Sequence, residues 1–158
     1  MIPLKNVAIV GLQSIPPGHL FVIRVQGGST LALRTSQGNG AVLFRPQVGP
    51  TFIDWQVDLP CADLGTSGVV RSLTIPGSLD GLPTARIPGN LAIQGGAICI
   101  VARLEQTHAG FEGELLVDIA TGAVVAPTNQ AWYVTQWCLG LEDVYGGFHE
   151  LFRHSDLG

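Results

Sequence analysis

Short apolar segments, separated by glycine and proline, form the dominant hydrophobic pattern of this chain. The segments are rich in Val, Ile, Leu and Phe, and turn residues bound nearly all of them. Segments of about four to eight residues bounded in this way are typical of β-strands. The pattern predicts strands at Val7–Leu12, Leu20–Gln26, Thr30–Thr35, Ala41–Arg45, Phe52–Val57, Val69–Ile75, Leu91–Ile93, Ala97–Glu105, Glu114–Ala120 and Trp132–Trp137.

The spacing of these strands predicts the fold class. No segment with the period of an amphipathic helix separates one strand from the next. Many short strands with closely spaced turn signals favour a sandwich or barrel over alternating strand–helix units. We therefore expect a mostly β protein, an antiparallel β-sandwich or barrel of about 8–10 short strands. No linker-like or like-charged stretch divides the chain, so residues 1–158 are expected to form a single β-rich domain.

The clearest local signal is a β-hairpin. Apolar and other residues alternate over Thr30–Thr35 and again over Ala41–Arg45, with Ser-Gln-Gly-Asn-Gly between the two segments. Asn39-Gly40 is expected to supply the residues with positive φ that a tight hairpin turn needs. Pro46 is expected to end the second strand, because proline has no backbone N–H for the ladder.

One short sequence recurs along the chain. Ile75–Leu79 reads Ile-Pro-Gly-Ser-Leu, Ile87–Leu91 reads Ile-Pro-Gly-Asn-Leu, and Ile15–Leu20 is a looser version. Proline favours the second position of a tight turn, and glycine supplies positive φ at the third. Because a repeat array needs about three or more regular copies, we interpret this recurrence as repeated turn chemistry.

The last part of the chain has a different pattern. Phe148, Leu151 and Phe152 recur at the i, i+3, i+4 spacing of a helix face, directly after Gly146-Gly147. This spacing predicts a short C-terminal helical cap within residues 141–155. Such a helix would cover an open edge of the sheet and block unwanted strand addition.

The chain has few charged residues, which indicates that part of its surface is buried against a partner. The chain has 8 Lys and Arg and 12 Asp and Glu, a charged fraction of 13% and a net charge of −4. An average soluble domain is roughly 25% charged. The balance is acidic and no basic run occurs, so nucleic-acid binding is not expected. Strands with two apolar faces, such as residues 20–25 and 97–102, are expected either in a core or at a subunit contact, which favours a homo-oligomer or a protein partner.

The cysteines indicate the cellular compartment, and the long uncharged stretches have to be considered as membrane spans. Cys61, Cys99 and Cys138 form no Cys-x-x-Cys motif, and their odd number does not suggest a disulfide framework. A reducing, cytoplasmic compartment is the simplest expectation. Turn residues interrupt the uncharged stretches at 87–102 and 119–141, so neither is expected to span a membrane.

One string resembles a zinc-binding motif. His149 and His154 flank Glu-Leu-Phe-Arg, one residue longer than the spacing in His-Glu-x-x-His. On a helix, positions five apart point in different directions, so the two imidazoles would not share one metal ion. No metal site and no cofactor are expected.

Nucleophilic catalysis is the weakest of the alternatives kept open. A small hydrolase would use Cys61, or a carboxylate from the group Asp54, Asp58 and Asp63, together with a histidine. The neighbouring carboxylates disfavour a Cys61 thiolate, so a loop cysteine is the simpler interpretation. No spacing selects the base among the four histidines, which are His19, His108, His149 and His154.

Ligand binding is a further alternative. Tyr133 and Trp137 share one face of a predicted strand and would form a stacking platform for a sugar or another small ligand. Core packing of the two rings is the competing interpretation. Arg34 and Arg45, near the ends of two predicted strands, would add a small anion-binding patch, or would only keep the surface charged.

No motif in the chain identifies a reaction. The phosphate-binding glycine loops and the nucleophile elbow are all missing from the sequence. The leading hypothesis is a non-enzymatic interaction or assembly protein that works as an oligomer. The alternatives are a β domain that binds a small ligand or carbohydrate, and a small hydrolase.

Overall fold

A computed structural model describes residues 7–25, 28–55, 57–66, 68–72, 79–104 and 113–155. These residues are mostly β, as predicted, with two short 3-10 helices at η1 (Leu12–Ser14) and η2 (Pro83–Ala85). The strands are β1 (Ala8–Gly11), β2 (Leu20–Val25), β3 (Gly28–Arg34), β4 (Gly40–Arg45), β5 (Gly49–Asp54), β6 (Pro60–Gly65), β7 (Gly68–Ser72), β8 (Leu79–Asp80), β9 (Leu91–Gln94), β10 (Ala97–Leu104), β11 (Glu114–Asp118), β12 (Val124–Val125), β13 (Trp132–Val134), β14 (Gln136–Glu142) and β15 (Phe148–Ser155).

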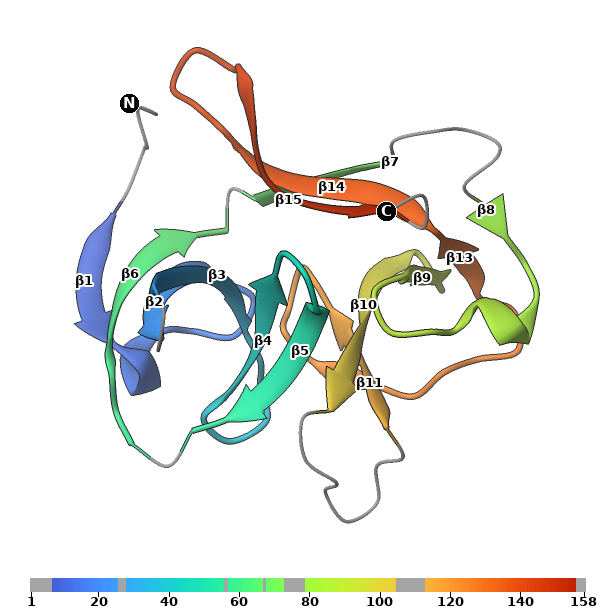
Figure 1. The fold of residues 1–158 in the computed structure, drawn as a ribbon, viewed down its shortest axis with the longest axis horizontal. Coiled ribbons are helices and arrows are strands. Elements are labelled where there is room, and N and C mark those ends of the chain that lie inside the picture. The colour runs from blue at the N-terminus through green and yellow to red at the C-terminus, as the bar shows by residue number, and fades with distance from the viewer. Residues whose placement is uncertain are drawn as a thin grey trace.

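The described strands form two sheets. The larger runs β1-β6-β2-β3-β4-β5-β10-β9-β13-β8, and β11 and β12 branch from β10. Its pairs are antiparallel except β5–β10, which is parallel. The smaller sheet runs β15-β14-β7 and lies across the larger one (Figure 1). The predicted mostly β fold is therefore confirmed, with one parallel pair that the sequence did not indicate.

The fold consists of two structural repeats. Residues 8–72 run β1-η1-β2-β3-β4-β5-β6-β7, and residues 79–142 run β8-η2-β9-β10-β11-β12-β13-β14. In the first repeat β6 lies between β1 and β2, and β2, β3, β4 and β5 follow as neighbours. In the second repeat β13 lies between β8 and β9, and β10, β11 and β12 follow in the same way. Every strand pair within the first repeat therefore has a counterpart in the second.

Equivalent hydrogen bonds at one turn of each repeat support the match between the repeats. Gly18 donates its N–H to the carbonyl oxygen of Arg34 at 2.9 Å, and Gly89 donates to that of Val101 at 2.9 Å. Strand β7 of the first repeat and β14 of the second pair antiparallel with each other, as equivalent strands do across a two-fold axis. An approximate two-fold relation between the repeats predicts this β7–β14 pairing, and the parallel β5–β10 pair, which has no β12–β3 counterpart among the described strands, departs from it.

The Ile-Pro-Pro-Gly sequence at 15–18 and the Ile-Pro-Gly sequence at 87–89 mark equivalent positions of the two repeats. Gly18 and Gly89, at the third turn positions, have φ values of 89° and 106°. The repeated turn chemistry predicted for these two copies is confirmed, and each turn precedes the second strand of its repeat. In the third copy, residues 75–78 lie outside the described residues.

Apolar side chains gather in three cores. The first-repeat core surrounds Phe21 and Ile23, and the second-repeat core surrounds Cys99 and Tyr133. A central core around Trp137 lies between the repeats and the small sheet, and it takes residues from all three. Strands such as β2 are apolar on both faces because one face lines its own repeat and the other faces the central core.

The predicted C-terminal helix is wrong. Residues 148–155 form strand β15, which pairs antiparallel with β14. Phe152 is buried while its neighbours Leu151 and Arg153 are exposed, which is the period-two pattern of a strand. The turn before it is closed by Asp143, whose carboxylate accepts hydrogen bonds from the N–H groups of Tyr145 and Gly147. This turn directs the chain back along β14.

The predicted hairpin is confirmed, but its turn uses another residue. Strands β3 and β4 pair antiparallel, with Arg34 opposite Ala41. The residue with positive φ is Gly38, at 52°, and no described residue other than glycine has positive φ. Gly40 is needed for a different reason, because a Cβ there would lie 2.5 Å from the ring of Phe52.

Candidate functional site

The two aromatic residues predicted as a stacking platform are buried. Tyr133 is 2% exposed and Trp137 is 0% exposed. The indole N–H of Trp137 donates to the carbonyl oxygen of Gly89 at 2.8 Å, and its ring centroid lies 5.5 Å from that of Phe152. Both rings therefore pack in the cores, as the competing interpretation holds, and neither offers a face to a ligand at the surface.

Arg34 is a structural residue of the first repeat. Its guanidinium is buried and donates hydrogen bonds to the backbone carbonyl oxygens of Leu12, Thr35, Gly38 and Gly40. Burial lowers the pKa of Arg34, while the nearby carboxylate of Asp54 raises it. The group stays charged at neutral pH and joins the 3-10 helix η1 to the β3–β4 turn.

Arg45 does not join Arg34 in an anion-binding patch. Arg34 lies opposite Ala41 near the turn of the β3–β4 hairpin, and Arg45 lies opposite Gly49 at the start of the next turn. The two arginines are therefore at opposite ends of strand β4. The structure does not bring together the polar groups that the ligand-binding alternative requires.

Cys61 lies in a strand rather than a loop. Its side chain is buried in the first-repeat core, and its thiol donates a hydrogen bond to the carbonyl oxygen of Leu59 at 3.3 Å. Burial raises the pKa of Cys61 to about 11, and the carboxylate of Asp58 adds to the effect. A thiol that stays protonated at neutral pH is a poor nucleophile, so the hydrolase alternative loses its cysteine.

The histidines in the described residues each contact a different polar partner. His19 Nδ1 lies 3.0 Å from the carboxylate of Asp63, and His149 Nε2 lies 2.6 Å from that of Asp143. The hydrogen bond from His149 lowers the pKa of Asp143, and the turn amides add to this. His154 contacts the side-chain oxygen of Asn90 at 3.2 Å. His108 lies outside the described residues.

The acidic residues are separated in the fold. Asp54 accepts a hydrogen bond from the N–H of Asn39, Asp58 from that of Gln13 and Asp63 from that of Gly65, so each carboxylate binds a different segment of the backbone. Within the ranges that the structure describes, no three His, Cys, Asp or Glu side chains are placed to hold a metal ion.

The second repeat carries a continuous row of apolar side chains on one face. Trp132 of β13 lies opposite Ile93 of β9, and Ile93 lies opposite Ile98 of β10. Ile119 extends the row, since its N–H donates to the carbonyl oxygen of Ile98 at 3.0 Å. Trp132 is 56% exposed, Ile98 40% and Ile93 36%. We call Trp132, Ile93, Ile98 and Ile119 the apolar row.

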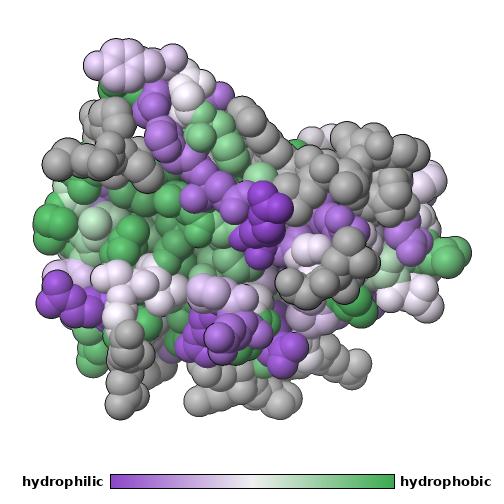
Figure 2. Space-filling view, turned by 45° about the horizontal axis from the view of Figure 1, so that its top comes forward, coloured by the Kyte–Doolittle hydropathy of each residue, from purple (hydrophilic) through white to green (hydrophobic). Residues whose placement is uncertain are grey.

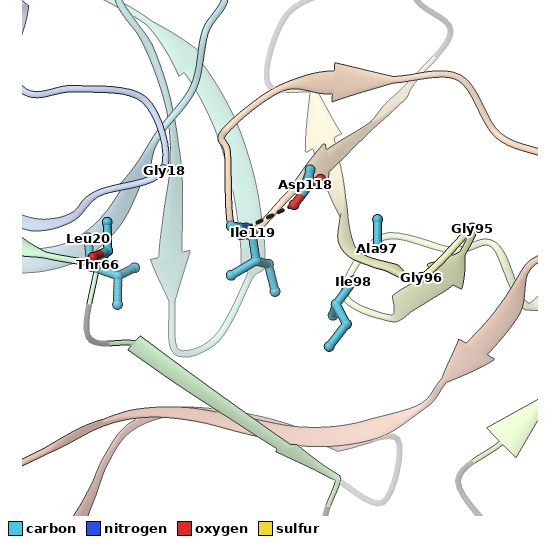
Figure 3. A pocket seen from close by; sticks show the side chains of 10 residues that line it. Gly18, Leu20, Thr66, Gly95, Gly96, Ala97, Ile98, Asp118 and Ile119 are labelled. Carbon is cyan, nitrogen blue, oxygen red and sulfur yellow. Dashed lines mark hydrogen bonds between the residues drawn. The ribbon is translucent and has the colours of Figure 1, made fainter.

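A cavity of about 570 Å³ adjoins one end of the apolar row. Ile98 and Ile119 point into it, toward strand β7, and Leu20 lines it from the first repeat (Figure 3). Asp118 is the charged residue of its lining, and one oxygen of its carboxylate accepts a hydrogen bond from the N–H of Ala120. A volume of this size lies within the range of roughly 300–1,000 Å³ of ordinary binding sites.

The equivalent row of the first repeat is more covered. Ile9, Ala62, Val22 and Leu31 lie opposite one another across β1, β6, β2 and β3. Ile9, at its outer end, is 73% exposed, whereas Val22 and Leu31 are partly buried against the central core. Figure 2 shows apolar side chains gathered between the β14–β15 hairpin and the first repeat.

The apolar row is the feature that sequence reasoning missed. The two-sided hydrophobicity of residues 97–102 predicts a core or a contact surface, and Ile100 and Val101 lie in two different cores. Recognising the two repeats in the sequence would have located the apolar row, because equivalent positions lie on the same face of each repeat. Ile93 and Ile98 match Val22 and Leu31, so all four lie on the outer face of their repeats.

None of the described helices has the length and apolar character needed to cross a membrane. No protein-family model matches the chain, and neither the curated proteins nor the solved structures give a match.

Proposed function

We propose that this protein is a non-enzymatic assembly protein that self-associates through the apolar row of its second repeat. The observation that carries the proposal is the alignment of Trp132, Ile93 and Ile98, which are all exposed and lie opposite one another. Exposed apolar side chains that are scattered singly are normal, but a contiguous patch marks an interaction surface.

The shape of the row suits a flat contact. It crosses from β13 to the end of β11, which is three strand spacings or about 14 Å. Gly81 lies beneath the Trp132 ring, because a Cβ there would be 3.1 Å from the ring. The glycine lets the indole lie against the sheet and present its outer face. Tryptophan is enriched among the residues that dominate binding energy.

A second copy of the chain is the partner that the surface chemistry favours. The row has no charged member, and the whole chain has only 8 basic and 12 acidic residues to cover its surface. Self-complementary contact about a two-fold axis is the commonest way to bury such a surface. All three cysteines are buried thiols, which fits a reducing compartment such as the cytoplasm.

The test is the mass of the protein in solution. Light scattering after size exclusion, over an approximately hundredfold dilution, is expected to give a fixed multiple of 16.7 kDa. Ile93→Asp places a charge in the middle of the row and is expected to give a 16.7 kDa species, because burying an unpaired carboxylate is costly.

Val144→Asp is the matched control. Val144 is also an exposed aliphatic residue, at 49%, but it lies in the β14–β15 turn away from the row. Its variant is expected to keep the mass of the native protein. A native chain that stays a monomer at every concentration, or a control that dissociates like Ile93→Asp, overturns the proposal.

A further inference from the structure

Strand β15 breaks the two-fold relation of the repeats. It follows β14 and pairs with the edge of β14 that faces away from β7. The approximate two-fold rotation exchanges β14 with β7, so the place equivalent to β15 lies along the outer edge of β7. Within the described part of the chain, β7 is the last strand of the small sheet on that side.

The contacts of β15 show which side chains a strand in this position inserts into the molecule. Phe152 inserts its ring between Phe44 and Trp137, with centroid distances of 5.2 and 5.5 Å. His154 reaches Asn90 in the turn before β9. The space that remains beside these residues, between the β4–β5 turn and Gly89, has a volume of about 330 Å³. In one half of the molecule, an extended strand with an inward aromatic ring therefore fills the site.

The 570 Å³ cavity lies at the equivalent place in the other half. Its lining includes Gly18 and the turn after β11, which match Gly89 and the turn after β4. Ile119 stands where the first repeat has Phe44. The smaller side chain enlarges the space, and no described residue occupies the position of the Phe152 ring. We call this cavity and the outer edge of β7 the β7 groove.

The charge of the β7 groove narrows the choice of occupant. Asp118 lines the groove, whereas the described lining of the filled site has no carboxylate. Among the described residues, no hydrogen bond is made to the second carboxylate oxygen of Asp118, which leaves it for a cation at the groove. The chain as a whole has a net charge of −4. An occupant with a basic residue near its apolar residue complements Asp118, whereas in β15 the basic residue beside Phe152, Arg153, pairs with Glu150 of the same strand.

We propose that the β7 groove binds an extended segment of a partner protein. The segment adds antiparallel to β7, inserts a large apolar side chain between Ile98 and Ile119, and places a basic residue near Asp118. Strand addition of this kind gains affinity from main-chain hydrogen bonds and specificity from the pocket for a side chain. The inference goes beyond the proposed self-association, because the occupant is a different chain that adds to a strand edge. The two contacts share Ile98 and Ile119, so they exclude each other.

A peptide with the sequence of residues 148–155 is the natural probe. It has the inward phenylalanine that the equivalent site accepts, and its arginine supplies the basic residue for Asp118. Fluorescence anisotropy of the labelled peptide with the full chain is expected to show saturable 1:1 binding. Hydrogen exchange is expected to slow at the β7 amides. The titration uses the Ile93→Asp chain, so that its result does not depend on self-association.

Two substitutions test the groove. Ile98→Asp is expected to weaken peptide binding at least tenfold, since it places a charge where the apolar side chain enters. Asp118→Asn keeps the hydrogen bond to Ala120 and is expected to weaken binding several-fold at low salt. The same change is expected to reduce the salt dependence of binding, because it removes the charge that the peptide arginine meets.

Val48→Asp is the control for strand exchange. Val48 lines the smaller cavity beside β15 and, like Ile98, is an exposed aliphatic residue. If Val48→Asp weakens binding and Ile98→Asp does not, the peptide has replaced β15 and the proposal is overturned. Absence of binding at millimolar peptide also overturns it, as does a native dimer that Asp118→Asn dissociates, which would assign the groove to a second copy. Far-ultraviolet circular dichroism verifies that each variant is folded.

Discussion

At the scale of single residues, Arg34 carries the most structural information. Four backbone carbonyl groups of the first repeat converge on its buried guanidinium, from η1 and from the turn between β3 and β4. The sequence indicated only an arginine near a strand end, which is usually a surface charge. What a charged side chain contacts depends on segments distant in the chain, and local hydrophobic patterns do not encode those contacts.

Removal of the guanidinium is expected to be costly. Arg34→Met keeps much of the aliphatic volume but leaves buried carbonyl oxygens without donors. The free energy of unfolding is expected to fall by about 2–3 kcal/mol, the range for losing buried hydrogen bonds to a charged group. Urea denaturation of the variant measures this change. Arg24→Met, at an exposed position of the neighbouring strand β2, is expected to change stability by less than about 0.5 kcal/mol.

At the scale of elements, β15 shows where pattern reading fails. Phe148, Leu151 and Phe152 fit a helix face, and Phe148 and Phe152 also fit one face of a strand. A short apolar pattern does not distinguish a helix from a strand. Here residues 148–155 form a strand because the edge of β14 offers backbone hydrogen-bond partners. Strand β6 was missed for a related reason. Its sequence, Pro-Cys-Ala-Asp-Leu-Gly, has too few large apolar residues to stand out as a strand.

The strand assignment makes opposite predictions for two neighbouring residues. Phe152→Ala is expected to destabilise the protein by about 3–5 kcal/mol, because a buried ring between Phe44 and Trp137 is lost. Leu151→Ala is expected to cost well under about 1 kcal/mol, because Leu151 is 38% exposed on the other face of the strand. Thermal unfolding of both variants measures the difference. Equal and large losses would instead indicate that both side chains are buried.

At the scale of the whole molecule, the mostly β class followed from the sequence, but the duplication did not. The two repeats share similar turns, Ile-Pro-Pro-Gly and Ile-Pro-Gly, and the sequence Gln-Gly-Gly at 26–28 and 94–96, and little else. Their hairpins differ in length, with β2 six residues long and β9 four. Because of these differences, equivalent residues are not separated by a constant number of positions in the sequence. The order of strand pairing is nevertheless the same in both repeats. The apolar row and the β7 groove follow from the duplication, so neither was predictable from strand patterns alone.

The repeats are expected to unfold together. The central core takes side chains from both repeats and from the small sheet, and the parallel β5–β10 pair joins the halves. Circular dichroism and tryptophan fluorescence are therefore expected to report one denaturant transition with a common midpoint. Trp55 packs against the first-repeat core and Trp137 lies in the central core, so fluorescence samples two regions. Two separate midpoints would mean that the repeats are independent folding units.

The single copy of β15 also determines stoichiometry and direction. Two equivalent repeats would otherwise give two equivalent strand sites, one on each side of the small sheet. Because the chain fills one of them with its own β15, one β7 groove remains for each molecule. Complexes formed through that groove therefore contain one partner segment per chain, and that segment always lies on the β7 side of the small sheet, opposite β15.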